Sequence, residues 1–346
     1  MKFTQLLLVL SVALLATTFT ACAQEYTSVA EVMATNDGTD FTVQGEYSVP
    51  EIQLFFQVIA KGNGNFDIVG YKGGLPGEGW DRSRARFFGK GEIKDGKLEI
   101  TGVKMDIPRK GEEREIIFDD DQKVKWGMSA RRENGKTFFA MHGKEFEAVK
   151  LERKSPTLGE KAPEGAFVVF DGTNLDNFEA GAKINEKTGD LWAEAQTKPF
   201  ERRPYKMHIE FLTSFMPHSE GQARSNSGVY IDDSYECQVL DSFGLEGKDN
   251  ECGGFYQASQ PIVNMAFPPL TWQTYDIDFT PAKFEDGKKV ANARFTVYHN
   301  GVKIHDDIEL SENTPGHKPE EDAAHGLYLQ GHGNHVQYRN IWVQYK

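Results

Sequence analysis

The C-terminal half of this 346-residue chain contains short segments in which polar and apolar residues alternate. In the segment 235–239, for example, Glu236 and Gln238 oppose one aromatic and two apolar side chains. Because successive side chains of a strand point to opposite faces, such polar sets should line the outer face of a sheet. Carboxylates, amides and hydroxyls suit hydrogen bonding to a sugar, and an ordinary solvated sheet face is the alternative. The residues on the polar sides of their strands are Glu210, Asn226, Tyr230, Glu236, Gln238, Gln330 and His332.

The elements that must position these side chains are short strands. Alternation recurs in 208–212, 226–231, 274–279 and 327–332, and no long helical period interrupts it. Asn300-Gly301, between two such runs, is a two-residue hairpin signal. Many short strands separated by turn residues predict an all-β sandwich or barrel.

Proline and glycine cluster in 154–165 (KSPTLGEKAPEG), where no apolar period runs. This segment is expected to be a linker between a smaller β-rich domain, 26–153, and a second domain, 166–346. In the first domain we expect a short helix over 28–34, strands over 41–47 and 54–60, an irregular surface loop over 73–79, and solvated hairpins over 109–125.

The first 23 residues have the pattern of a secretory signal. Lys2 precedes an apolar run, Leu6 to Leu15, and Ala21-Cys22-Ala23 follows. The mature protein is therefore expected to be exported, to the periplasm or beyond, either as a soluble product starting at Gln24 or with a lipid anchor on Cys22. No later stretch is apolar and long enough to span a membrane.

The net charge of the chain indicates which class of partner it binds. A net charge of −13 argues against nucleic acid, whose phosphates need cations, and a polar or neutral small ligand fits better.

Cys237 and Cys252 remain after processing, and an oxidising compartment would allow a disulfide between them. Two buried free thiols are the alternative.

The C-terminal half resembles the 3-keto-disaccharide hydrolase family from about Phe167 to Lys346. The matching segments are FDGT at 170, NSGVY at 226, YECQVLD at 235, WQTYD at 272, HNG at 299, LQGHG at 329 and YRNIW at 338. Each is short, and their order and spacing together carry the resemblance. It implies a concanavalin-like jelly-roll β-sandwich, a small oxidised carbohydrate as ligand, and action on glycosides that carry a ketone at C3.

A C3 ketone acidifies the C2 proton, so a base can form an enolate, expel the C1 substituent and let water add to the enone. This route needs a general base and an electrophile, either a hydrogen-bond donor or a metal, at the developing oxyanion. We expect His332 or Glu236 to be the base. Glu210, Glu236 and His332 could together hold a divalent metal ion whose identity is open. The expected substrate-binding residues are Asn226, Tyr230, Gln238, Gln330 and Arg339, the last of which could instead pair with a surface carboxylate.

Two other functions remain open. The same architecture serves proteins that bind carbohydrate without catalysis, since fold does not fix function. A conventional endo-glucanase of this fold would carry a Glu-x-Asp-x-x-Glu pattern, and 236–241 (ECQVLD) is a poor substitute.

Overall fold

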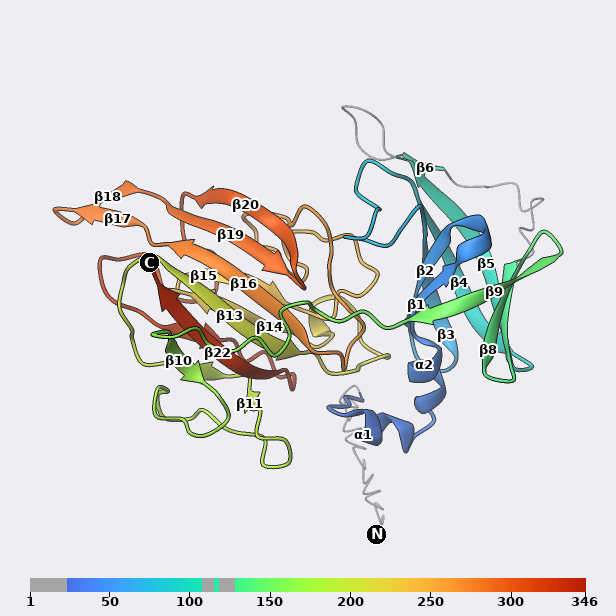
Figure 1. Ribbon diagram of the computed structural model, residues 1–346, viewed down its shortest axis with the longest axis horizontal. Helices are drawn as coiled ribbons and strands as arrows, with labels where there is room; N and C mark the ends of the chain where they lie inside the picture. Colours follow the sequence, from blue (N-terminus) through green and yellow to red (C-terminus); the bar gives the residue numbers. More distant parts are fainter. Residues whose placement is uncertain (1–23, 108–114, 118–127) are drawn as a thin grey trace, which may run out of the picture.

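A computed structural model describes residues 24–107, 115–117 and 128–346, and its elements are almost all β-strands (Figure 1). Two predictions fall wholly or mostly outside the described residues, the signal segment 1–23 and the hairpins of 109–125. In the described part of the chain, no helix has the length and apolar character of a membrane span.

The first domain is a closed antiparallel barrel. Its sheet has nine strands, and because β4 pairs with β5 as well as with β3, all of them except β6 form a closed ring. Two short helices, α1 (Val29–Met33) and α2 (Gly38–Val43), precede it. The strands are β1 (Gly45–Val49), β2 (Leu54–Ala60), β3 (Asn65–Lys72), β4 (Arg86–Lys94), β5 (Lys97–Ile107), β6 (Glu115–Ile117), β7 (Met128–Glu133), β8 (Lys136–Met141) and β9 (Lys144–Leu151), with a 3₁₀ turn, η1, at Pro50–Ile52.

Two expectations for this domain are wrong. The segment 41–47 is not one strand, because Phe41 to Val43 complete helix α2 and the strand starts only at Gly45. The expectation of a surface loop over 73–79 is wrong for its middle, because Leu75 is fully buried in the hydrophobic cluster shared with the second domain, whereas both ends of the loop are exposed. A Cβ on Gly77 would come within 2.4 Å of Met265 Sδ, so glycine at this position permits the close approach of the two domains.

The second domain is the expected two-sheet β-sandwich. Its larger sheet has the order β10-β22-β13-β16-β19-β20, with β11 added on β22, and its smaller sheet has the order β12-β21-β14-β15. The larger sheet contains β10 (Phe167–Phe170), β11 (Leu191–Trp192), β13 (Tyr205–Leu212), β16 (Gln273–Thr280), β19 (Ala293–His299), β20 (Val302–Leu310) and β22 (Gln337–Tyr345). The smaller sheet contains β12 (Ala195–Gln196), β14 (Ser227–Ile231), β15 (Tyr235–Val239) and β21 (Leu327–Leu329). A hairpin of β17 (Lys283–Glu285) and β18 (Lys288–Ala291) projects from one end, and a 3₁₀ turn, η2, spans Gly221–Ala223.

The core of the sandwich is built from the inward set of each alternating strand. Ile209 and Phe211 from β13 meet Val229 from β14 and Val239 from β15, and all are fully buried. This arrangement is the one that alternation predicts for two sheets packed face to face. It also sends the polar set of each sheet outward, away from the other sheet.

The two cysteines are free and buried, so the predicted disulfide is not formed. Cys237 points into the core from β15, and Cys252 Sγ lies 3.2 Å from the Tyr275 hydroxyl. Burial raises the pKa of Cys252 to about 11 and that of Cys237 further, so both thiols stay protonated at neutral pH. They pack as small apolar side chains, which is common for free cysteine.

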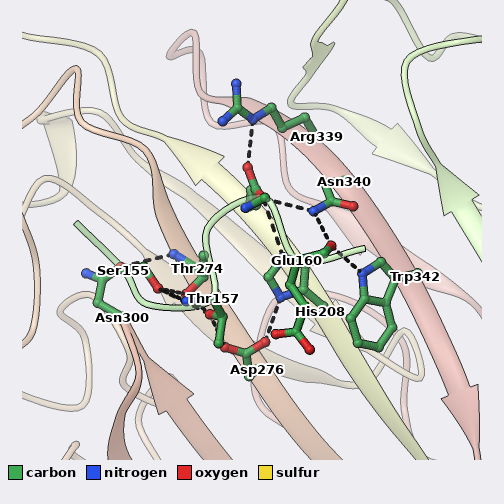
Figure 2. Close-up of polar contacts among 12 residues, drawn as sticks. Ser155, Thr157, Glu160, His208, Thr274, Asp276, Asn300, Arg339, Asn340 and Trp342 are labelled. Atoms are coloured by element: carbon green, nitrogen blue, oxygen red, sulfur yellow. Dashed lines mark hydrogen bonds and ion pairs between the residues drawn. The ribbon is translucent and has the colours of Figure 1, made fainter. Parts of the chain in front are cut away.

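The segment after the barrel crosses the outer face of the larger sheet (Figure 2). Ser155 Oγ lies 2.6 Å from Thr274 Oγ1, and the Thr157 hydroxyl donates to Asp276 Oδ2 at 2.7 Å. Further along, the Glu160 carbonyl accepts from Trp342 Nε1 at 3.3 Å and from Asn340 Nδ2 at 2.9 Å. The segment is therefore fastened along its length by the outward side chains of β16 and β22.

Beneath this segment lies a compensated set of charges. His208 Nδ1 lies 2.6 Å from Asp276 Oδ1, while Nε2 lies 3.5 Å from Glu210 Oε1. Burial alone would lower the pKa of His208, but these two carboxylates outweigh it and raise the pKa to about 9. Burial would raise the pKa of Glu210, but bonds from His208, Asn340, Arg339 and the Gly159 N–H lower it to about 2. The imidazolium ring also stacks on Trp342.

This network predicts a pH-dependent stability. The pKa of His208 in the folded protein lies above the ordinary 6.5, so its contribution is complete below pH 6.5 and disappears as pH rises through about 9. The contribution of Glu210 is present above its ordinary pKa of 4.5 and disappears as pH falls through about 2. In urea unfolding, His208→Gln should therefore be less stable than the wild type at pH 6, and the difference should shrink towards pH 9.5. The exposed His332→Gln is the control, and a difference that is constant with pH would contradict the assignment.

Candidate functional site

The predicted polar residues occupy two faces that point away from each other. Glu210 lies on β13 of the larger sheet, with Ile209 and Phe211 pointing into the core. Glu236 lies on β15 of the smaller sheet, with Tyr235 and Cys237 pointing into the same core from the other side. The expectation that Glu210 and Glu236 belong to one shared site is therefore wrong. The physical reason is that outward positions of two facing sheets lie on opposite sides of the sandwich.

The outer face of the smaller sheet encloses a carboxylate that forms no ion pair with any residue the structure describes. Glu236 is 2% exposed, and its side chain accepts a hydrogen bond from the Tyr230 hydroxyl at 3.0 Å. Burial raises the pKa of Glu236 to about 7, although the Tyr230 bond by itself favours the ionised form. A carboxyl group with a pKa near neutrality can both take up and release a proton under ordinary conditions.

Tyr230 lies between Glu236 and a carbonyl. Its oxygen is 3.0 Å from Glu236 Oε2 and 2.9 Å from the Pro315 carbonyl oxygen, and a phenol has one proton to donate. When Glu236 is ionised, Tyr230 can donate to it. When Glu236 is protonated, the carboxyl can donate to Tyr230, which then donates to Pro315. Both protonation states of Glu236 are thus satisfied without a movement of the chain.

Gly228 leaves the space that the Glu236 carboxylate occupies. The two residues lie on paired strands, and a Cβ on Gly228 would come within 2.2 Å of Glu236 Oε1. The loop that joins β20 to β21 closes the face from the other side. The Thr314 hydroxyl oxygen of this loop accepts from the Glu236 N–H at 2.7 Å.

The predicted substrate-binding residues divide into inner and outer ones. Gln238 Nε2 donates to Asn226 Oδ1 at 2.8 Å, and Asn226 Nδ2 donates to the Gln222 carbonyl at 2.8 Å, so these two buried amides bind each other and the backbone. Gln330 is half-buried, and its Oε1 has no hydrogen-bond partner among the residues that the structure describes. Gln330 Nε2 lies 3.5 Å from the Tyr230 hydroxyl, which links it to the carboxylate.

His332 and Arg339 lie outside this cluster. His332 is exposed, two residues beyond Gln330, and no hydrogen bond joins it to Glu236. Arg339 lies on β22 of the larger sheet, where Nε donates to Glu210 at 2.7 Å and the guanidinium covers the Trp272 ring at 3.9 Å. Arg339 thus pairs with a carboxylate, as in its alternative interpretation, but that carboxylate is the buried Glu210 rather than a surface group, and Arg339 is not beside Glu236.

Two aromatic residues beside Tyr230 were not among the predicted site residues. His317 stacks on Tyr328 with ring centroids 4.3 Å apart, and both rings contact that of Tyr230. Burial lowers the pKa of His317, which favours the neutral ring. Tyr328 could have been found, because it shares the outward side of its strand with Gln330. His317 sits in the loop between β20 and β21, where no periodicity signals its position.

The predicted metal ligands do not converge. Glu210 is bound to Arg339 and Asn340 on one face, whereas Glu236 lies on the other, and His332 is exposed. Within the described ranges, the side chains close enough to share an ion are Glu160, His208 and Asp276, whose candidate ligand atoms lie within 4.8 Å of one another. An ion-pair network also accounts for this group, because His208 Nδ1 lies 2.6 Å from Asp276 Oδ1 and the neighbouring carboxylates raise the pKa of His208 to about 9.

The second domain and the last part of the barrel match a known protein family. Residues 134–344, more than half of the chain, match the family described as the 3-keto-alpha-glucoside-1,2-lyase-like domain. The chain belongs to this family. The match starts within the barrel, at the turn before β8, and runs almost to the end of β22. The resemblance predicted from the C-terminal motifs is therefore confirmed, and family membership supports a glycoside-processing function.

Two crystal structures of proteins from Parabacteroides distasonis, both provisionally named glycosyl hydrolases, are each similar to about half of this chain. One is 28% identical, with a TM-score of 0.48, and the match covers 54% of this chain and 86% of the other. The second is 15% identical, with a TM-score of 0.36, and the match covers 52% and 93%. No curated protein is significantly similar to the chain.

The position of Gly228 gives a test of the site. Gly228→Ala would place a methyl group where Glu236 Oε1 lies, so the flexible carboxylate must move away from Tyr230 while the strands stay paired. We expect a loss of glycoside-processing activity of about 100-fold, the size of a displaced general base, with a melting temperature close to that of the wild type. Gly287→Ala, in the turn of the projecting β17–β18 hairpin, is the control: a Cβ there would meet nothing within 4 Å, and any backbone strain from its φ of +72° falls outside the Glu236 cluster. Full activity in Gly228→Ala would remove Glu236 from the chemistry.

Proposed function

We propose that this protein cleaves 3-keto-glycosides by elimination across C1 and C2, with Glu236 as the general base. The observation that carries the proposal is the buried carboxyl of Glu236, whose pKa lies at about 7 and whose nearest partner is a phenol rather than a cation. A base that removes a proton beside a ketone works best when its pKa lies near the working pH. The family description, which names a 1,2-lyase of 3-keto-α-glucosides, supports the same chemistry.

The proposed reaction balances as follows. Glu236 takes the C2 proton, and the electron pair of the C2–H bond forms the enolate of the C3 ketone. The enolate then re-forms the ketone and expels the C1 oxygen, which takes up the proton held by Glu236 and leaves as the free alcohol, and an enone remains. Water adds at C1 and a proton returns to C2, so that the net result is hydrolysis. This route requires no pair of carboxylates at a set separation, in contrast to an ordinary glycosidase.

The half-buried members of the cluster are the groups that a sugar entering from solvent meets first. Gln330 Oε1 is itself buried and has no hydrogen-bond partner among the described residues, so in this proposal the half-buried side chain turns to accept a hydrogen bond from a sugar hydroxyl, with the Tyr328 ring on the same side of the strand. We assign His332, which is exposed and lies outside the cluster two residues beyond Gln330, to the leaving alcohol or the developing oxyanion of a bound substrate rather than to C2. We also propose that the protein acts after export, as the pattern of residues 1–23 predicts.

Substrate comparison tests the reaction. The protein is incubated with an aryl 3-keto-α-glucoside, with the same substrate deuterated at C2, and with the unoxidised glucoside. We expect release of the aryl alcohol from the keto sugar alone, and slower release from the deuterated form. Binding of the keto sugar without release would favour a non-catalytic carbohydrate-binding protein. Equal cleavage of the unoxidised glucoside would contradict elimination.

Glu236→Gln tests the base. Turnover should fall by about 100-fold or more. The control is Glu312→Gln, at an exposed position in the loop that joins β20 to β21, which should keep full activity. In the wild type, kcat/KM should rise with pH through about 7, because the base must be ionised. His332→Ala should reduce kcat but keep that rise. If kcat/KM still rises with pH in the residual activity of Glu236→Gln, and no longer does so in His332→Ala, the base is His332.

A further inference from the structure

The barrel of the first domain is hollow at one end. A cavity of about 740 Å³ lies inside it, which falls within the range of small-molecule binding sites. The cavity is reached where the turns β4–β5 and β7–β8 meet helix α2, and residues of all three line it. A closed barrel of about this size is wide enough to hold one small ligand.

The walls of this cavity are apolar. Strand alternation sends Phe56 and Val58 from β2, Ile68 from β3, and Leu98 from β5 inward, and Phe139 from β8 faces them. Most of these side chains are buried, and they form a hydrophobic cluster separate from the core of the sandwich. The interior therefore suits a hydrocarbon or aromatic body rather than a sugar.

Two cations stand at the mouth of the cavity without carboxylate partners. Arg132 on β7 and Lys150 on β9 have the inward register of their strands, and both line the cavity. Within the part of the chain that the structure describes, neither forms an ion pair, and the Lys150 ammonium donates only to the Thr42 carbonyl of α2, at 2.6 Å. The other cations around the mouth are neutralised: Arg131 by Glu133 and Glu145, and Lys136 by Glu147.

The two cations act on each other. Lys150 is an exposed residue overall, yet desolvation of its ammonium and the charge of Arg132 lower its pKa to about 8, and the opposing charge of Glu152, which forms no ion pair with Lys150, only partly offsets them. Burial raises the pKa of the neighbouring Tyr47 to about 12, against the charge of Arg132, so that phenol stays neutral and supplies no negative charge. An anion held between Arg132 and Lys150 would relieve this repulsion.

We propose that the barrel binds an amphipathic monoanion, with its apolar body in the cavity and its anionic head between Arg132 and Lys150. The proposal concerns a site on the first domain and does not depend on the reaction at Glu236. Apolar walls account for affinity, and the unpaired cations account for a preference for an anion over a neutral molecule of equal length.

Titration calorimetry on the full chain tests this with two probes, decanoate and decanol, that differ only in the head group. The wild type should bind decanoate at least 10-fold more tightly than decanol. Arg132→Gln/Lys150→Gln should lose this preference while still binding decanol. The matched control is Lys283→Gln/Lys288→Gln, which removes two exposed cations from the projecting β17–β18 hairpin and should change nothing.

Cavity-filling variants locate the binding. Ala130→Trp, with Ala130→Leu as the milder form, should weaken binding of both probes, because Ala130 lines the cavity. Near-ultraviolet circular dichroism establishes that each variant is folded. The proposal is overturned if neither probe binds, if both bind equally and Arg132→Gln/Lys150→Gln makes no difference, or if folded Ala130 variants bind as the wild type does.

Discussion

A carboxylate that is removed from water without a cation beside it is unfavourable, and its pKa rises until protonation relieves the cost. Glu236 is in this situation, since burial raises its pKa to about 7 and a phenol is its side-chain partner. Glu210 is equally buried, but Arg339, His208 and Asn340 surround it and its pKa falls to about 2. The same residue type at the same kind of strand position thus has a pKa near neutrality on one sheet and a pKa well below its usual value on the other.

The two outer faces of the sandwich therefore differ in how their buried charges are compensated. On the larger sheet, the segment after the barrel crosses the outward side chains, and every charge beneath it has an opposite charge within reach. That face is suited to fastening the two domains together. On the smaller sheet, Gly228 and Tyr230 make room for a carboxylate and hold it without neutralising it. That face is suited to proton transfer.

Sequence pattern was a good guide to the strands and a poor guide to what the outward residues do. Alternation correctly placed Glu236 and Glu210 on outer faces, because period two follows from strand geometry alone. It could not show that the two faces are opposed, since that depends on which sheet each strand joins. Phe41 to Val43 were misassigned because β-branched and aromatic residues favour strands, whereas tertiary packing at the barrel end makes them helical. The role of His317 depends on a loop crossing a distant sheet, which no local pattern encodes.

The family match begins inside the barrel, at residue 134, and this agrees with how the two domains are joined. Ile59, Val69 and Tyr71 point out of the barrel and belong to the same hydrophobic cluster as the sandwich core. The buried ion pair of Arg153 with Glu46 closes the junction, and breaking such a pair leaves an uncompensated charge in the interior. Removing the barrel would therefore expose part of the sandwich core. The inward residues of β2 and β3 that line the barrel cavity do not include Ile59, Val69 or Tyr71, so the contact with the sandwich and the cavity use different faces of the same strands.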